Sequence, residues 1–432
     1  MRIDAHVHYM PPELARDLEA FCQQEPYWGL LVGPGARGRS VQGWASAEQM
    51  IDDMDEAGLD RVVLQGEYRL RHEACVARND QALTIIQRWP ERVIAFATLQ
   101  PLAGLAALDE LRRCLDGGMR GVGELSPYAQ GCSLRHPDFL RLVEACIAAN
   151  MPLCLHTNED VGPYYPGKGA TPLAHCYQLA CRYPELKLIL AHWGGGLFLY
   201  ELMPKVRRQL QSVWYDTAAS PMLFPTADVF GVALRCVDHR KVLLASDYPL
   251  LLYPERRRQL PVSLADRPDF RTFQAEVAGL NLPPQVYQDI SGDNAAHLLG
   301  LIPAGSGSRD EKPDSPSPPT PPPEDSGAAR APFPHPPGPL LPRGEGGDRL
   351  PSPSGRGAGG DGIPAGPVTG MMPVTLVAES WPATRPIFDR YGIPWLDSPV
   401  PFWEPIVQAA AARGYGPADQ RCLLDELNAA LA

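Results

Sequence analysis

Eight short apolar segments limit most strongly what this chain can fold into. They alternate with stretches of helical periodicity and comprise residues 3–8, 61–65, 93–97, 121–125, 152–156, 187–192, 213–217 and 241–247. Near-continuous apolar strands separated by helices indicate a parallel sheet whose outer face the helices cover. Eight such units within about 250 residues predict an α/β fold, the (β/α)8 TIM barrel.

Helix signals lie between these segments. Ser46 and Gln49 have the spacing of a helix cap, a second helix should end before Pro90, and a third at Gly117–Gly118. The main alternative is an open doubly wound sheet. That fold is disfavoured because no glycine-rich phosphate-binding loop follows the first segment.

The composition changes after Ile302. Eighteen of the 48 prolines lie between Pro303 and Gly370, and Phe333 is the one aromatic residue there. Such a segment buries too little apolar surface to order itself, so we expect a disordered linker. Apolar residues with helical spacing return beyond it. The predicted domains are a barrel at 1–302, a linker at 303–370 and a small helical domain at 371–432.

Charge and cysteine content restrict the partners and the compartment. The net charge is −11 and no basic cluster marks a nucleic-acid surface. No apolar run approaches the roughly 18 residues of a membrane span, and the first strand begins too early to leave room for a signal peptide. Ten cysteines without a Cys-x-x-Cys pair suit a reducing compartment. We therefore expect a cytoplasmic protein with a small-molecule substrate and no nucleic-acid or membrane partner; a homo-oligomer stays open.

The first segment carries the first sign of chemistry. Because side chains alternate along a strand, His6 and His8 should project the same way, with Ile3, Ala5 and Val7 packing outward against helices. Two adjacent imidazoles make half of a metal site. A single His-x-His pair, however, is as well explained by one core histidine and one solvent-facing histidine.

Four further polar side chains occur where predicted strands end. They are Glu124, His156, His192 and Asp247. The carboxyl ends of barrel strands share one face, where active sites lie. Each residue alone could be a loop cap or a rim charge, but packing alone would be satisfied by Val or Leu. Together with the first pair, they predict a metal site.

This order of motifs resembles the amidohydrolase superfamily. His6-Val7-His8, a strand-end His156, His192 followed by glycines, and Ser246-Asp247-Tyr248-Pro249 resemble in particular its amidohydrolase-2 branch, which includes aminocarboxymuconate-semialdehyde decarboxylase. The likeness covers residues 1 to about 302 and implies a TIM barrel. It also implies that His6, His8, His156 and Asp247 bind the metal, and that His192 polarises or holds the substrate.

The chemistry of these groups agrees with that assignment. Three imidazoles, one carboxylate and an open position suit a catalytic Zn²⁺, with Mn²⁺ or Fe²⁺ as alternatives. Such a metal activates water at neutral pH, Asp247 can take and return its proton, and His192 can stabilise a developing oxyanion. Glu124 leaves the number of metals open, because some superfamily members hold a second metal there. We favour one divalent metal.

The loop after His156 supplies candidate substrate-binding residues. Asn158 lies two residues further along, and Lys168 stands between two glycines. Lys168 could meet a substrate carboxylate, although a lysine in this setting is also typical of an exposed loop.

The C-terminal region has a resemblance of its own. Ser380-Trp381-Pro382, Arg390-Tyr391-Gly392-Ile393 and Leu424–Asn428 look like a small helical domain that accompanies hybrid-cluster and other redox proteins. The cysteines usual after the Gly-Ile turn are absent, since residues 394–396 are Pro, Trp and Leu. A redox role is therefore disfavoured, and we expect docking of a protein partner or oligomerisation.

Three functions follow. The first is a metal-dependent hydrolase that cleaves a C–N or C–O bond in a small carbonyl- or carboxylate-bearing substrate. The second is a non-oxidative decarboxylase of the same fold. The third is a non-catalytic metal-binding scaffold, which the intact set of ligands disfavours.

Overall fold

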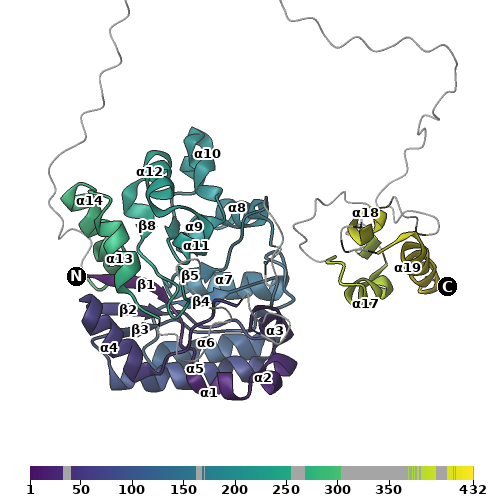
Figure 1. Cartoon of the computed structure of the whole chain (residues 1–432), viewed down its shortest axis with the longest axis horizontal. Coiled ribbons are helices and arrows are strands. Elements are labelled where there is room, and N and C mark those ends of the chain that lie inside the picture. The colour runs from purple at the N-terminus through teal and green to yellow at the C-terminus, as the bar shows by residue number, and fades with distance from the viewer. Residues whose placement is uncertain are drawn as a thin grey trace, which may run out of the picture. The chain divides into compact units, whose positions relative to one another are not determined.

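The computed structural model describes residues 1–32, 40–161, 168–169, 171–253 and 268–302, and, towards the C-terminus, 368, 372, 374, 377–378, 381–395, 406–411, 413 and 415–431. Each predicted apolar segment contains a strand: β1 (Ile3–Val7), β2 (Arg61–Leu64), β3 (Val93–Ala95), β4 (Val122–Leu125), β5 (Leu153–Leu155), β6 (Leu188–Leu190), β7 (Val213–Asp216) and β8 (Val242–Leu243). Helices surround these strands (Figure 1). The predicted TIM barrel is confirmed.

Among the helices of the described barrel residues, one begins directly after Ser46, one ends before Pro90 and one ends before Gly117, as predicted. The helices are α1 (Pro12–Arg16), α2 (Leu18–Gln24), α3 (Pro26–Val32), α4 (Ala47–Ala57), α5 (His72–Arg88), α6 (Leu105–Asp116), α7 (Pro137–Ala148), α8 (Leu173–Arg182), α9 (Ala191–Gly194), α10 (Pro204–Gln209), α11 (Ser220–Leu223), α12 (Thr226–Cys236), α13 (Arg271–Ala278), α14 (Pro284–Gln288) and α15 (Asn294–Leu298). At the start of α4, the backbone N–H of Gln49 donates to Ser46 Oγ over 3.1 Å, as the cap spacing predicted.

Parallel pairing closes the strands into a ring. The strands pair in the orders β1-β2-β3 and β4-β5-β6-β7-β8. Parallel bridges of Ala97 with Val122 and of Val7 with Tyr248 join the two sets. All carboxyl ends therefore face the same side of the barrel, where a shared site can form.

The two faces of each strand pack into different apolar clusters. On β2, Val62 and Leu64 belong to a large cluster that includes Met50 of α4, so this face points toward the helices. Val63, which lies between them, belongs to a smaller cluster. Because neighbours on a strand point to opposite faces, the smaller cluster lies inside the barrel.

Strand β1 departs from the predicted alternation. Ile3 and Ala5 lie in the interior cluster, whereas Val7 lies in the cluster that faces the helices. The expectation that Ile3 and Ala5 pack outward is therefore wrong. The pairing of β1 with β2 shifts register between Asp4 and Val7, and such an irregularity breaks the two-residue alternation.

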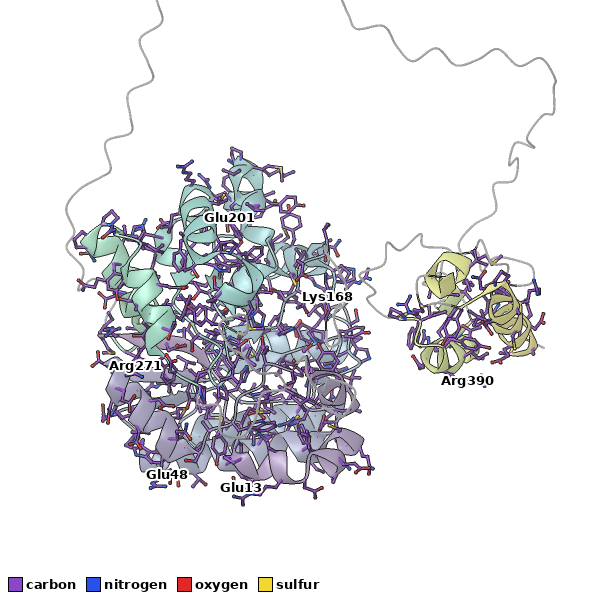
Figure 2. All side chains as sticks on the ribbon, in the orientation of Figure 1. Glu13, Glu48, Lys168, Glu201, Arg271 and Arg390 are labelled. Carbon is purple, nitrogen blue, oxygen red and sulfur yellow. The ribbon has the colours of Figure 1, made fainter. Side chains whose placement is uncertain are left out.

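Charged side chains cover the outside of the barrel. Figure 2 shows Glu13, Glu48 and Arg271 on this surface, and all three are exposed. In the part of the chain that the structure describes, no helix is long and apolar enough to cross a membrane.

The described C-terminal residues form helices with a core of their own. These helices are α17 (Arg385–Arg390), α18 (Ile406–Ala411) and α19 (Pro417–Ala429), and their buried residues include Phe388, Leu423 and Leu427. Val368 exchanges two backbone hydrogen bonds with the Asn428 side chain, of 2.7 and 2.9 Å. Apart from Val368, the predicted linker at 303–370 lies outside the described residues.

Candidate metal centre

His6 and His8 project together from the carboxyl end of β1, as predicted. Their Nε2 atoms are 3.1 Å apart, and both side chains are buried. Two lone pairs that face each other at this distance repel unless a proton or a cation lies between them. The pair is therefore suited to hold a cation.

Two carboxylates complete this side of the centre. Asp247, after β8, places Oδ1 3.2 Å from His8 Nε2 and 3.8 Å from His6 Nε2. Glu124, on β4, places Oε2 3.8 Å from His8 Nε2 and 3.9 Å from His6 Nε2. Residues from three strand ends, those of β1, β4 and β8, thus converge on one buried point.

The other oxygen of Glu124 faces a second pair of histidines. Oε1 lies 2.9 Å from His156 Nδ1 and 3.4 Å from His192 Nε2. His156 Nδ1 and His192 Nε2 are themselves 3.1 Å apart. Glu124 therefore lies between two groups, each with ligand atoms within 4.8 Å of one another.

This arrangement divides the set of ligands expected from the sequence. His6, His8 and Asp247 lie together, but His156 contacts Glu124 and His192 instead. Glu124, which the sequence left ambiguous, is the residue that joins the two groups.

A left-handed turn orients His192. His192 and Trp193 both have φ near 58°, a conformation that non-glycine residues rarely adopt and that often marks functional sites. His192 Nδ1–H donates to the carbonyl oxygen of Ala218 over 3.1 Å. The other ring nitrogen, Nε2, faces Glu124 Oε1.

Asp216 is a functional residue that the sequence reasoning missed. It ends β7 and is fully buried. Its Oδ2 accepts from His6 Nδ1–H over 2.9 Å, and its Oδ1 accepts from the backbone N–H groups of His192 and Ala218, each over 3.0 Å. A carboxylate on the far nitrogen sets which tautomer faces the metal. Its position at a strand end was the available signal.

Buried opposite charges determine how these groups ionise. Burial alone would lower the pKa of His6, but the charges of Asp216 and Glu124 raise that pKa well above its usual value. Burial alone would raise the pKa of Glu124, but the charges of His156 and His6 hold that pKa well below its usual value. Glu124 is thus anionic at neutral pH, which favours a bound cation.

The donor set fits a divalent metal. Ligand atoms about 2.0–2.1 Å from a tetrahedral Zn²⁺ lie about 3.3 Å from one another. The separations of His6 from His8 and of His8 from Asp247, 3.1 and 3.2 Å, are close to that value. Imidazole nitrogens and carboxylate oxygens are also suitable ligands for Mn²⁺ and Fe²⁺.

The predicted substrate-binding residues have local partners. Asn158 Oδ1 accepts from the backbone N–H of Gly169 over 2.7 Å, and a side chain added at Gly169 would lie 3.7 Å from His156 Cδ2. This segment therefore lies beside the centre. Lys168, which Figure 2 labels, pairs through Nζ with Glu159 Oε1 over 2.9 Å. Its charge is therefore already compensated.

We expect Asp216→Asn to weaken metal binding by about 10- to 100-fold. An asparagine can still accept from the two backbone N–H groups, but its NH₂ would face His6 Nδ1. His6 would then carry its proton on Nε2, where the metal must bind. Competition with a chelator measures the affinity. Asp289→Asn is the matched control, because Asp289 pairs with His239 over 2.8 Å near the surface; equal affinities in both variants would contradict the role of Asp216.

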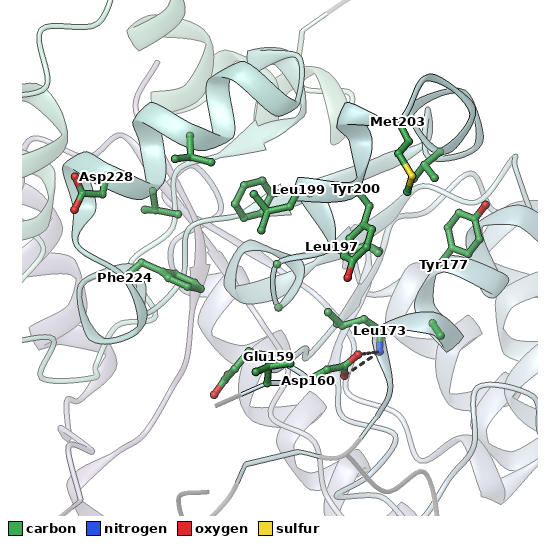
Figure 3. A pocket seen from close by; sticks show the side chains of 18 of the residues that line it. Glu159, Asp160, Leu173, Tyr177, Leu197, Leu199, Tyr200, Met203, Phe224 and Asp228 are labelled. Atoms are coloured by element: carbon green, nitrogen blue, oxygen red, sulfur yellow. Dashed lines mark hydrogen bonds between the residues drawn. The ribbon is translucent and has the colours of Figure 1, made fainter. Parts of the chain in front are cut away.

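A pocket of about 780 Å³ lies next to the centre but is not part of it. Figure 3 shows its mostly apolar lining, which includes Leu197, Leu199, Tyr200 and Phe224. Glu159 and Asp160 follow His156 in the chain and also line it. Among the described lining residues there is no histidine of the centre.

Comparisons with known proteins agree with this geometry. An amidohydrolase family model matches residues 3–301. The 2-amino-3-carboxymuconate-6-semialdehyde decarboxylase of Dictyostelium discoideum is 24% identical over 258 residues, which span 52% of this chain and 66% of that protein. The family match ends at residue 301, so the resemblance noted for the C-terminal region stays a prediction.

Solved structures share the barrel. The 5-carboxyvanillate decarboxylase of Sphingomonas paucimobilis has a TM-score of 0.53 at 15% identity, with 69% of this chain and 98% of that chain covered. The 5-carboxyvanillate decarboxylase of Novosphingobium aromaticivorans, complexed with manganese and 4-hydroxy-3-methoxy-5-nitrobenzoic acid, has a TM-score of 0.53 at 16% identity, with 70% and 96% covered. At these identities the likeness concerns the fold.

Proposed function

Because the chain belongs to the amidohydrolase family, we propose that it is a metal-dependent enzyme acting on a small carboxylate- or carbonyl-bearing substrate. One observation carries this proposal: four histidines and two carboxylates from different strand ends converge in one buried cluster. Burying so many ionisable groups is costly unless they bind a cation or do chemistry. A non-catalytic scaffold would not require the whole set.

Non-oxidative decarboxylation is the reaction that we favour. It was the second function expected from the sequence, and the names of the curated relative and of both structural neighbours now support it. Hydrolysis of a C–N or C–O bond is the second candidate, because the family description is that of an amidohydrolase. Release of CO₂, against release of an amine or acid, distinguishes the two reactions.

Different residues of the candidate metal centre would have different roles in the reaction. His6, His8, Glu124 and Asp247 would hold a divalent cation, which would act as a Lewis acid toward a substrate oxygen. Burial alone would raise the pKa of Asp247, but its hydrogen bond with His8 and the charge of His6 lower that pKa below its usual value. Asp247 is therefore ionised and able to take a proton, which it can return later in the reaction.

His192 would stabilise charge that develops on the substrate. Burial alone would lower its pKa, but its hydrogen bond with Glu124 and the charge of Asp247 raise that pKa to about 9. A positive or hydrogen-bonding imidazole in a water-poor site stabilises an oxyanion. In decarboxylation, the negative charge left when CO₂ departs would need the same stabilisation.

We propose Zn²⁺ as the metal, with Mn²⁺ and Fe²⁺ as alternatives, and expect purified protein to hold close to one equivalent. Elemental analysis measures this. His6→Ala should lose the metal, whereas His239→Ala, at a surface ion pair, should keep it. No metal in the wild-type protein, even after reconstitution, would contradict the assignment. Two equivalents would instead indicate a second ion held by His156 and His192, with Glu124 bridging the two ions.

The expected cytoplasmic location is also a proposal. All ten cysteines lie in the described part of the chain and none forms a disulfide. Seven of them are buried, and free buried thiols are typical of proteins in reducing compartments.

A further inference from the structure

Asp247 lies beyond the end of its strand. Strand β8 ends at Leu243, so regular strand pairing does not extend to Asp247. The backbone of Asp247 also has φ of 68°, a conformation that residues other than glycine rarely adopt and that persists only where the surrounding structure holds it. Contacts from neighbouring strands must therefore fix the segment that leads to this carboxylate.

Thr217 holds this segment from the side of β7. It follows directly on that strand and is fully buried. Its Oγ1 accepts from the backbone N–H of Ala245 and donates to the carbonyl oxygen of Ala245, each over 2.8 Å. Buried backbone groups without partners are costly. One hydroxyl thus supplies both hydrogen bonds that a neighbouring strand would otherwise provide.

Asp4 holds the next residue of the segment from the side of β1. Its buried Oδ1 accepts from the backbone N–H of Ser246 and from that of His6, each over 3.1 Å. The Ser246 side chain also hydrogen-bonds Asp4, and its Oγ accepts from the backbone N–H of Tyr248 over 3.1 Å. One carboxylate oxygen therefore links His6 to the residue that precedes Asp247.

Backbone hydrogen bonds continue this link up to the centre. The N–H of Asp247 donates to the carbonyl oxygen of His6 over 2.9 Å, and the N–H of His8 donates to that of Tyr248 over 2.6 Å. Asp247 Oδ1 lies 3.8 Å from His6 Nε2 and 3.2 Å from His8 Nε2. A shift of the segment along β1 would change both separations, so the geometry of the ligands depends on what holds the segment.

We propose that Asp4 and Thr217 are positioning residues for the metal centre. They hold the segment before Asp247 from opposite sides and act through its backbone, not as ligands. Residues that support metal ligands in this way typically change metal affinity by 10- to 100-fold when they are replaced. This inference rests on the proposed function, because it takes Asp247 as a ligand of a divalent cation.

Thr217→Val tests the side of β7, because valine keeps the shape of threonine but removes the partner of both Ala245 backbone groups. The probe is Co²⁺, titrated into the metal-free full-length protein. Co²⁺ binds nitrogen and oxygen ligands, and its visible absorption spectrum depends on their geometry. We expect an affinity about tenfold lower than in the wild type and a changed spectrum. Thr217→Ser keeps the hydroxyl and should restore both.

Asp4→Ala tests the side of β1 and should have the same two effects. Asp4→Asn keeps the oxygen that accepts from His6 and Ser246, so it should bind Co²⁺ like the wild type. Ile94→Val is the control for stability, because it shortens a side chain of the interior cluster on β3. It should lower the thermal unfolding temperature but leave the Co²⁺ affinity and spectrum unchanged.

Wild-type affinity and spectrum in Thr217→Val would overturn the role of Thr217, and the same result in Asp4→Ala would overturn that of Asp4. An equal change in Thr217→Ser or Ile94→Val would assign the effect to packing and overturn the inference as a whole. If Asp4→Ala does not fold, the two Thr217 variants decide. A wild-type protein that binds no Co²⁺ would overturn the proposed metal centre itself, whereas wild-type behaviour of the variants overturns this inference alone.

Discussion

Asparagine in place of Asp247 should reduce turnover by at least about a hundredfold, while most of the metal stays bound. Asparagine keeps an oxygen that can approach the metal, but it cannot take up a proton. Asp247 has φ of 68°, and asparagine is one of the few residues that tolerate this left-handed conformation. The variant should therefore lose catalytic activity but remain folded.

Steady-state rates and metal analysis of the same preparations test this expectation. Asp238→Asn is the control, because Asp238 pairs with Arg240 away from the centre and should leave the rate unchanged. His192→Asn, also in a left-handed turn, should keep the metal and lose about a hundredfold in rate. If Asp247→Asn kept full activity while His192→Asn lost the metal, the roles assigned to Asp247 and His192 would have to be exchanged.

Glu124→Gln should lower the affinity for the metal by about a hundredfold. Its carboxylate lies between the two groups of histidines and supplies one oxygen to each. Glutamine keeps the shape but removes the charge, and an amide NH₂ would face a histidine nitrogen at one of the two positions. Losing a charged partner in a buried network costs more than losing a surface ion pair.

Equilibrium dialysis against the metal measures this loss, and thermal unfolding shows whether the barrel remains folded. Glu110→Gln is a matched control, because Glu110 is also buried but pairs with Arg113 on α6. It should bind metal like the wild type. Unchanged affinity in Glu124→Gln would mean that Glu124 is not a ligand. Loss of one of two equivalents would instead identify it as a bridge.

The sequence pattern alone was sufficient to predict the barrel fold. Strand β5, for example, reads Leu153-Cys154-Leu155 and is apolar on both faces, because a barrel strand packs against helices outside and other strands inside. The pattern could not show the register shift in β1, since that shift depends on pairing with β2. For that reason, the side of the strand toward which Ile3 and Ala5 point was predicted wrongly.

The polar strand ends likewise indicated which side chains share the centre. His6 and His8 lie two residues apart on one strand, and Glu124, His156, His192 and Asp247 each follow an apolar segment. Parallel topology brings all strand ends to one face, so their convergence follows from the fold class alone.

Only the tertiary structure decided how these residues are grouped and supported. Residue order carries no information on which side of Glu124 each histidine lies, because that depends on barrel closure and on side-chain rotamers. The bond from His6 to Asp216 joins residues 210 positions apart. The stacking of Trp28 on Tyr68 depends on how α3 folds over the loop after β2. Local periodicity determines the helices and strands, whereas contacts between elements that are distant in the sequence form only when the barrel closes.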